Sequence, residues 1–363
     1  LQIVDKCEEN HSCESEGAGK SEKMSFLRSV GDVIGFLLLS VATIIESIVK
    51  IFIPAKYKMK SIVGEIALVT GGGGGLGRLL SLRLANLGAI VVVWDINKAA
   101  IEETVKLVQA AGGTCYGYVC DLCDREDVYK KAALLKEQVG KVSILINNAG
   151  IVSGTKFLDT PDTMIIRTMD VNVMSHFWVS RHSRKSRIVC CNKGHIVSIA
   201  SMAGHVGISK LVDYCASKFA AVGFDEALHM ELEAEGYNIQ TTVVCPYFIR
   251  STGMFEDVHS RFVPTLSPND VAERAITAMR CNEKIALMPS YFNIMLALRW
   301  LVPWTCVAMF LRGIVQDASP IENKAPSTVI PKETPAPILL KDQISANIHH
   351  QLTRRISGPE RKP

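Results

Sequence analysis

Short runs of β-branched and other apolar residues recur along the middle of the chain, and longer stretches with helical periodicity separate them. Seven such runs predict strands: residues 66–70 (IALVT), 90–95 (IVVVWD), 114–120 (TCYGYVC), 142–147 (VSILIN), 195–199 (HIVSI), 239–245 (IQTTVVC) and 284–288 (KIALM). Alternating strands and helices are typical of parallel βαβ units with right-handed crossovers. We therefore expect an α/β fold, a doubly wound seven-stranded parallel sheet over residues 61–290.

An apolar stretch at residues 30–53 is long enough for a bilayer. Its charged residues Asp32, Glu46 and Lys50 leave a short uncharged core, although Glu46 and Lys50 can pair at i, i+4. A tilted transmembrane helix and a monotopic helix in one leaflet both fit, and a buried soluble helix is the alternative. The lysine-rich flank after this stretch predicts that the following domain faces the cytosol. We assign residues 24–60 to an N-terminal membrane anchor.

A second apolar zone follows the last predicted strand. It cannot span a membrane cleanly, because it carries two arginines and a helix-breaking proline: Arg299, Arg312 and Pro303. Its tryptophans, Trp300 and Trp304, have the amphipathic character favoured at a membrane interface. We expect residues 291–318 to form apolar helices that dock on a membrane as a flap over the functional site. A packed pair of C-terminal helices is the alternative.

The two ends of the chain have a different composition. Residues 1–23 are polar and rich in Glu, Ser and Gly, which predicts a disordered leader or a gene-model extension before a start at Met24. Residues 319–363 are rich in proline and poor in aromatic residues, which predicts a disordered tail.

Composition sharpens this picture. The 363 residues are 48% hydrophobic, and the mean hydropathy of +0.20 requires local apolar segments. A net charge of +4, spread along the chain, argues against a nucleic-acid binder. Eleven scattered cysteines without a cleavable signal indicate a reduced, cytosol-facing protein. Cys120 and Cys123 have no second ligand pair, so we expect strand-end packing there and no metal site.

A glycine-rich turn joins the first predicted strand to a helical pattern. Such a turn lets the backbone approach a pyrophosphate at the positive end of a helix. The next strand ends in Asp95, whose carboxylate would accept both hydroxyls of an adenosine ribose and repel a 2′-phosphate. The pattern indicates NAD rather than NADP, although nearby Lys98 weakens that preference. The turn supplies the candidate cofactor-binding residues Gly71, Gly73, Gly74, Gly75, Leu76 and Gly77.

Tyr214 and Lys218 lie four residues apart, which places a phenol and an ammonium on one face of a helix. At that spacing the cation can lower the pKa of the phenol. Ser201 follows a predicted strand thirteen residues upstream, where its hydroxyl could face the same cleft. Together with the glycine-rich turn, these residues resemble the short-chain dehydrogenase/reductase family, which is recognised by Tyr-x-x-x-Lys with an upstream Ser. The resemblance covers about residues 60–290 and implies a Rossmann-type fold.

Other positions match the motifs of that family. The segment Asn147, Asn148, Ala149 and Gly150 resembles the family motif that forms the floor of the cofactor site. Asp121 matches the acidic residue that contacts the adenine in the family, and Asn172 matches the fourth catalytic residue. The chain is similar to the membrane-bound 16C subgroup of the family in its N-terminal anchor and in the segments IPAKYK, VVWDIN and DYCASKFAAVGF. This subgroup includes epidermal retinol dehydrogenases and 17-beta-hydroxysteroid dehydrogenases of types 11 and 13. The subgroup implies a location at the endoplasmic reticulum membrane or the lipid droplet.

The resemblance implies oxidation of a lipophilic alcohol, or reduction of the matching ketone, with retinol first and hydroxysteroids second. Tyr214 would exchange the proton, Ser201 would hold the substrate oxygen, and Lys218 would also hold the nicotinamide ribose. Asn172 would support a proton-relaying water. Oxidation is the expected direction, since cytosolic NAD is mostly oxidised.

The chain departs from the family in two places. Residues 181–187, within the unusual segment 181–193, carry four cations and no apolar residue where the family has an amphipathic helix that commonly contributes to a homodimer interface. We hypothesise an alternative or mispredicted exon there, and transcript sequencing would test it. After Pro246, the family's nicotinamide-contacting Thr falls at Ser251, with Thr252 one residue late. Either a bulge restores Thr252 or Ser251 substitutes.

Two other functions remain open at this point. The first is a lipid-droplet or reticulum surface protein whose dehydrogenase domain has weak or lost catalysis, which the unusual segment 181–193 motivates. The second is a soluble reductase of small carbonyls, which both apolar ends oppose. NAD binding and partition into the carbonate-washed soluble fraction would discriminate between these functions.

Overall fold

A computed structural model describes residues 29–50, 52–183, 192–250, 254 and 263–314. The predicted leader 1–23, the predicted tail 319–363, Ser251 and Thr252 lie outside the described residues. Most of the unusual cationic segment, residues 184–191, lies outside them as well.

The seven predicted strands are all present and form one parallel sheet in the order β3-β2-β1-β4-β5-β6-β7. This confirms the predicted fold class. The order reverses between β1 and β4, and in doubly wound sheets ligands bind at the carboxyl ends of the strands beside such a reversal. The strands are β1 Ile66–Thr70, β2 Ile90–Asp95, β3 Thr114–Val119, β4 Ile144–Asn147, β5 Gly194–Ile199, β6 Ile239–Pro246 and β7 Ile285–Met288.

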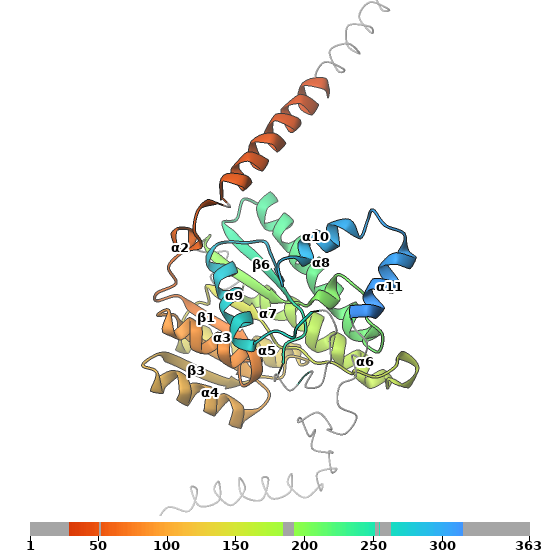
Figure 1. The fold of residues 1–363 in the computed structure, drawn as a ribbon. Coiled ribbons are helices and arrows are strands. Elements are labelled where there is room, and N and C mark those ends of the chain that lie inside the picture. Colours follow the sequence, from red (N-terminus) through yellow and green to blue (C-terminus); the bar gives the residue numbers. More distant parts are fainter. Residues whose placement is uncertain (1–28, 51, 184–191, 251–253, 255–262, 315–363) are drawn as a thin grey trace, which may run out of the picture. The chain divides into compact units, whose positions relative to one another are not determined.

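Helices cover both faces of the sheet (Figure 1). One face packs against α3 Gly75–Asn86, α4 Lys98–Ala110 and α9 Pro268–Arg280. The other face packs against α5 Arg125–Gln138, α7 Ser175–Ser183 and α8 Val212–Ala234. The shorter elements are α2 Ala55–Lys58, η1 Phe157–Asp159, α6 Asp162–Met169, the π-helical turn η2 Asp170–Met174, η4 Met202–Gly204, α10 Phe292–Leu298 and α11 Trp304–Ile314.

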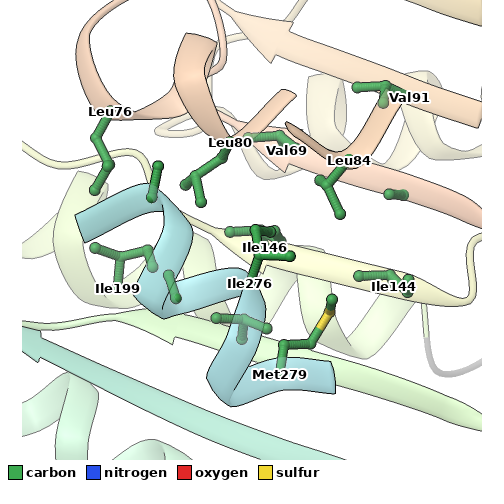
Figure 2. Packing of buried hydrophobic residues seen from close by; sticks show 14 of the residues in the cluster. Val69, Leu76, Leu80, Leu84, Val91, Ile144, Ile146, Ile199, Ile276 and Met279 are labelled. Carbon is green, nitrogen blue, oxygen red and sulfur yellow. The ribbon is translucent and has the colours of Figure 1, made fainter. Parts of the chain in front are cut away.

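Buried strand residues alternate between the two layers. Val69 faces the cluster that α3 and α9 share, whereas its neighbour Leu68 faces the opposite cluster. Figure 2 shows Leu80 and Leu84 of α3 beside Val69, with Ile276 and other residues of α9 below. Because both faces are covered, the strands read as nearly continuous apolar runs in the sequence.

Side-chain caps fix where two of the covering helices begin. The Asn97 side chain accepts a hydrogen bond from Ala100 N before α4, and the Asp124 side chain accepts from Glu126 N and Asp127 N before α5. Each cap satisfies backbone donors that have no partner within the helix. The strand-to-helix connections at the carboxyl edge of the sheet are therefore set by local sequence.

The N-terminal apolar stretch forms a helix, Ser29–Lys50, of 22 residues. Its most apolar 18-residue window has a mean hydropathy of 2.0, and none of that window is buried. At 1.5 Å per residue such a helix is about 33 Å long, comparable with the hydrocarbon core of a bilayer. Glu46 and Lys50 form the predicted ion pair, at 2.6 Å. By length and composition the helix could cross a membrane, and membrane anchoring stays a prediction.

Candidate active site

The glycine-rich turn closes tightly between β1 and α3. Gly71 has a φ of +62°, a left-handed value that glycine adopts without strain. A β-carbon at Gly77 would collide with the carbonyl oxygen of Gly71 and lie 2.7 Å from Asn148 Nδ2. The N-cap of α3 is Gly74, which has no side chain to cap the first turn. The backbone N–H groups of that turn are thus oriented for an anion such as a pyrophosphate.

Asp95, at the end of β2, fixes this turn from the side. Its Oδ2 accepts a hydrogen bond from Gly73 N at 3.0 Å, and its Oδ1 accepts from Asn97 N at 3.0 Å. The carbonyl oxygen of Gly73 accepts in turn from Arg78 Nη2 at 2.6 Å. A carboxylate consequently stands beside the glycine-rich turn, as the sequence predicted. The remaining turn positions, Gly75 and Leu76, begin α3.

The end of β4 is joined to the end of β1 by a hydrogen-bond network. Asn148 Nδ2 donates to Thr70 O at 2.9 Å and to Gly71 O at 3.1 Å. Thr70 Oγ1 accepts from Asn148 N at 3.0 Å and from Ala149 N at 3.2 Å. These bonds hold the segment Asn148 to Gly150 against the glycine-rich turn, at the point where the strand order reverses.

Tyr214 and Lys218 lie one turn apart near the start of α8, and both are buried, with 5% and 3% of their surface exposed. Lys218 Nζ lies 5.6 Å from the centroid of the Tyr214 ring and donates to Ile199 O at 2.9 Å. Ser201, at the N-cap of η4, hydrogen-bonds with Tyr214. Ser201 Oγ also accepts from Ala203 N at 3.1 Å and donates to the carbonyl oxygen of Pro246, at 3.4 Å. The structure therefore brings three of the predicted catalytic residues together.

Asn172 lies in the π-helical turn and is fully buried. Its amide makes a double hydrogen bond to the backbone of Ile151, accepting from N at 2.8 Å and donating to O at 2.9 Å. It also donates to Ser217 Oγ at 2.9 Å. A β-carbon at Gly150 would lie 3.4 Å from Asn172 Oδ1 and 3.5 Å from Lys218 Nζ. Asn172 thus links the segment after β4 to the helix that carries Tyr214.

Burial dominates the electrostatics of this cluster. It raises the pKa of the Tyr214 phenol well above its ordinary value, and the hydrogen bond with Ser201 opposes that rise. Burial lowers the pKa of Lys218 to about 8. The net direction is a rise in the phenol pKa, whereas the helix spacing predicted that Lys218 would lower it. The reason is desolvation of the phenolate, which sequence spacing does not report.

Two other predicted cofactor positions lie at strand ends. Asp121 follows β3, and its Oδ1 accepts from Cys123 N at 2.9 Å. Pro246 ends β6, and the next residue, Tyr247, donates its N–H to Met288 O at 2.8 Å. Both positions are at the carboxyl edge of the sheet, the edge that carries the glycine-rich turn.

A cavity of about 680 Å³ opens beside the cluster. Met202 and Tyr247, which line it, directly follow Ser201 and Pro246 in the chain. Its other walls come from the loop after η4 and from α10 and α11, and the lining is mostly apolar: Val206, Gly207, Ile208, Ser209, Phe292, Met295, Leu296, Leu298, Arg299, Val302, Trp304, Cys306, Val307, Ala308, Leu311 and Arg312. A cavity of this size and character suits a small lipophilic molecule.

The two C-terminal helices carry both buried and strongly exposed apolar side chains, and docking on a membrane stays a prediction. On their inner side Phe292 and Val307 are buried, as in a packed helix pair. Trp300 and Leu301, which are not part of the cavity lining, have 85% and 79% of their surface exposed. An apolar surface is therefore presented outside the cavity wall, as a membrane-docking flap would require.

Sequence reasoning missed residues that act through tertiary contacts. Thr70 joins two strand ends, Ser217 joins Asn172 to α8, and Arg78 supports the glycine-rich turn while pairing with Glu103 at 2.6 Å. A cation in the first turn after the glycine run was the available signal for Arg78. Nothing local in the sequence singles out Thr70 or Ser217.

Comparison with known families assigns this arrangement. Residues 65–261 match the family described as short chain dehydrogenase. The chain belongs to this family. It is 42% identical over 282 residues to epidermal retinol dehydrogenase 2 of Mus musculus, covering 76% of this chain and 90% of the relative. It is 39% identical over 282 residues to 17-beta-hydroxysteroid dehydrogenase 13 of Homo sapiens, covering 77% and 93%. The predicted subgroup is confirmed.

Solved structures agree with this assignment. A short-chain dehydrogenase/reductase from Burkholderia phymatum in complex with NAD superposes with a TM-score of 0.60 and 26% identity, over 67% of this chain and 95% of that one. Actinorhodin polyketide ketoreductase with NADPH superposes with a TM-score of 0.56 and 25% identity, over 62% and 95%. The prediction of a nicotinamide-dependent oxidoreductase is confirmed at this level.

Proposed function

We propose that the protein is a membrane-anchored, NAD-dependent dehydrogenase that reversibly oxidises a lipophilic alcohol, such as all-trans-retinol or a hydroxysteroid, to the aldehyde or ketone. The observation that carries the proposal is the joining of Ser201, Tyr214 and Lys218 beside an apolar cavity. The names of the relatives, a retinol dehydrogenase and a 17-beta-hydroxysteroid dehydrogenase, support both substrate classes.

In the oxidation direction, the C–H bond of the carbinol breaks and the hydrogen leaves with both electrons as a hydride. The hydroxyl proton passes to Tyr214, and a C=O bond forms. When bound, oxidised nicotinamide would supply the hydride acceptor and a positive charge beside these residues. Ser201 holds the substrate oxygen through its hydroxyl and stabilises its developing charge. Lys218 holds positive charge 5.6 Å from the Tyr214 ring, which favours the phenolate that burial disfavours.

The residues of the carboxyl edge fit a dinucleotide. The uncapped first turn of α3 suits the pyrophosphate, and Asp95 suits the adenosine ribose. The segment Asn148 to Gly150 forms the floor, with Lys218 next to Gly150 for the nicotinamide ribose. We assign Asp121 to the adenine, and Ser251 or Thr252 to the nicotinamide amide. Asn172 positions Gly150 and Ile151, and with them the water that relays the proton.

Asp95 is expected to decide between NAD and NADP. Replacing it by Asn removes the charge but keeps an acceptor for Gly73 N, so the turn stays supported. Two like charges about 4 Å apart repel by roughly 4 kcal/mol at an effective dielectric of 20. We therefore expect the ratio of kcat/KM with NAD to kcat/KM with NADP to fall by at least about a hundredfold.

Steady-state kinetics with both cofactors measure this ratio, and Asp121→Asn is the matched control at the neighbouring strand end. The control is expected to lower kcat/KM for both cofactors to the same degree, since adenine is common to both. An unchanged ratio in Asp95→Asn would assign cofactor choice to another residue.

We also propose that the helix Ser29–Lys50 anchors the protein in the endoplasmic reticulum membrane or the lipid-droplet monolayer, with the catalytic domain on the cytosolic side. Its apolar side chains are exposed: Leu38, for example, has 68% of its surface accessible. The exposed tryptophans of the α10–α11 segment supply a second contact with the same surface.

Arginine substitutions in the middle of this helix are expected to release the protein. Each arginine at the centre of a membrane helix costs about 2.5–3.5 kcal/mol on insertion scales. With Leu38→Arg and Ile45→Arg combined, most of the protein should leave the membrane pellet after a carbonate wash. The matched control Leu38→Ala with Ile45→Ala should stay in the pellet. Retention of the arginine variant after the wash would place the anchor elsewhere.

The activity itself is tested in microsomes that express the chain, with all-trans-retinol and estradiol as substrates and NAD or NADP as cofactor. We expect aldehyde or ketone formation that is faster with NAD. Protein that is present, membrane-bound and able to bind NAD but inactive on both substrates would favour the alternative, a surface protein with weak catalysis.

A further inference from the structure

The cavity beside the catalytic cluster carries two positive charges on an otherwise apolar wall. Arg299 and Arg312 line it, and none of its lining residues is acidic. A guanidinium that borders an apolar space offers charge and hydrogen-bond donors to an anion in that space. The lining can therefore bind an anionic group, which an uncharged lipophilic alcohol does not have.

Arg299 is held in place by its neighbours but is not neutralised. Its Nη1 donates to the carbonyl oxygen of His205, and its guanidinium lies 5.7 Å from the ring centroid of Trp300 and 5.9 Å from that of Trp304. Among the described residues, neither Arg299 nor Arg312 forms an ion pair. A guanidinium has five N–H donors, so several donors of Arg299 remain for a ligand.

The two arginines of the cavity wall differ in their exposure to solvent. Arg299 follows the end of α10 and is half-buried, and Arg312 is exposed in the last turn of α11. Tyr214, by contrast, is 5% exposed and packs in one buried cluster with Met202, Tyr247 and Phe292. The cavity wall therefore contains both arginines and the packing partners of Tyr214.

We infer that the cavity selects an acidic amphiphile: an apolar chain with a hydroxyl at one end and a carboxylate at the other, as in a hydroxy fatty acid. The carboxylate accepts hydrogen bonds from Arg299 and Arg312, the chain follows the apolar lining, and the hydroxyl reaches Ser201 and Tyr214. This inference rests on the proposed function for the chemistry of the hydroxyl, which becomes a carbonyl as described above. The binding preference for the acid is independent of turnover.

Binding of hexadecanoic acid and of methyl hexadecanoate to the full chain in detergent micelles tests the inference. The two ligands share the chain and differ in charge. We expect the acid to bind at least about tenfold more tightly than the ester in the wild type, since charge-assisted hydrogen bonds are the strong ones. In the double variant Arg299→Gln, Arg312→Gln this ratio should fall to about one.

Three further variants keep the result interpretable. Arg125→Gln, an exposed arginine of α5 paired with Glu126, should keep the wild-type ratio. Arg299→Lys preserves the charge, and Arg312→Gln removes an exposed side chain, so both should fold. The first should retain part of the preference and the second should reduce it. Equal binding of acid and ester by the wild type, or an undiminished ratio in the double variant, would overturn the inference.

Two further measurements complete the test. Vesicle binding distinguishes a fatty acid in the cavity from a lipid headgroup at its rim, and substrate oxidation distinguishes binding from turnover. If the arginines serve an anionic phospholipid of the membrane, the double variant will lose binding to phosphatidylserine vesicles while the acid-to-ester ratio stays at its wild-type value, which overturns the inference. Oxidation of 16-hydroxyhexadecanoic acid, its methyl ester and retinol reports on the chemistry. Turnover of retinol without acid preference contradicts this inference alone, whereas acid preference without any turnover contradicts the proposed function.

Discussion

Replacing Tyr214 by phenylalanine is expected to lower kcat for alcohol oxidation by roughly 10²- to 10⁴-fold, the range for loss of a general acid–base group. The phenylalanine ring fits the same buried site, because only the hydroxyl is removed and Tyr214 packs within an apolar cluster. Ser201 keeps its bonds to Ala203 N and to the Pro246 carbonyl oxygen. The fold and the affinity for NAD should therefore be little changed.

Retinol or estradiol oxidation in microsomes, together with NAD binding by the purified protein, measures this separation. The matched control is Tyr118→Phe, which removes a hydroxyl that donates to Gln138 on the protein surface, at 2.9 Å. The control should keep the wild-type kcat. A Tyr214→Phe enzyme within about threefold of the wild type would remove Tyr214 from the proton-transfer step.

The second large effect is expected from Gly77→Ala. The added methyl group would press against the carbonyl oxygen of Gly71 and against Asn148 Nδ2, and neither can move without breaking the joint between β1 and β4. Overpacking of this kind costs typically 1–3 kcal/mol. Because the displaced atoms belong to the proposed pyrophosphate site, the Kd for NAD should rise by at least about tenfold.

Gly223→Ala is the control for this variant. Gly223 is a glycine of α8, and a β-carbon there would meet no atom within 4 Å. Alanine is the better helix former by about 1 kcal/mol, so the control should unfold at the same temperature or higher and bind NAD as the wild type does. Calorimetric titration and thermal unfolding measure both variants. Unchanged NAD affinity in Gly77→Ala would mean that the turn does not form the pyrophosphate site.

The sheet could be predicted because its strands are buried on both faces. A run such as 66–70 is apolar up to Thr70, is buried throughout and is followed by a glycine, so its bounds follow from the sequence. The error is larger at β4, predicted from residue 142 but beginning at Ile144. Val142 is buried, yet the regular ladder with β1 starts only at Ile144. Apolar character marks burial, not ladder pairing.

The candidate site was predictable where one short motif specifies both chemistry and spacing, as with Tyr214 and Lys218 on one helix turn. It was not predictable where the environment decides. Burial raises the pKa of Tyr214, and no spacing rule reports the solvent exposure of a phenol. The same holds for Thr70, whose hydroxyl accepts from two N–H groups of another strand end.

The cavity wall has a consequence for how such an enzyme could diversify. The cofactor side is held together by backbone contacts of glycines such as Gly71 and Gly77, which tolerate little change. Most of the cavity lining consists of side chains on α10 and α11, which follow the last strand of the sheet. Exchanging that C-terminal segment between relatives could transfer preference for one alcohol over another while hydride transfer stays the same. The residues for hydride transfer and the residues for substrate choice thus lie in different segments of the chain.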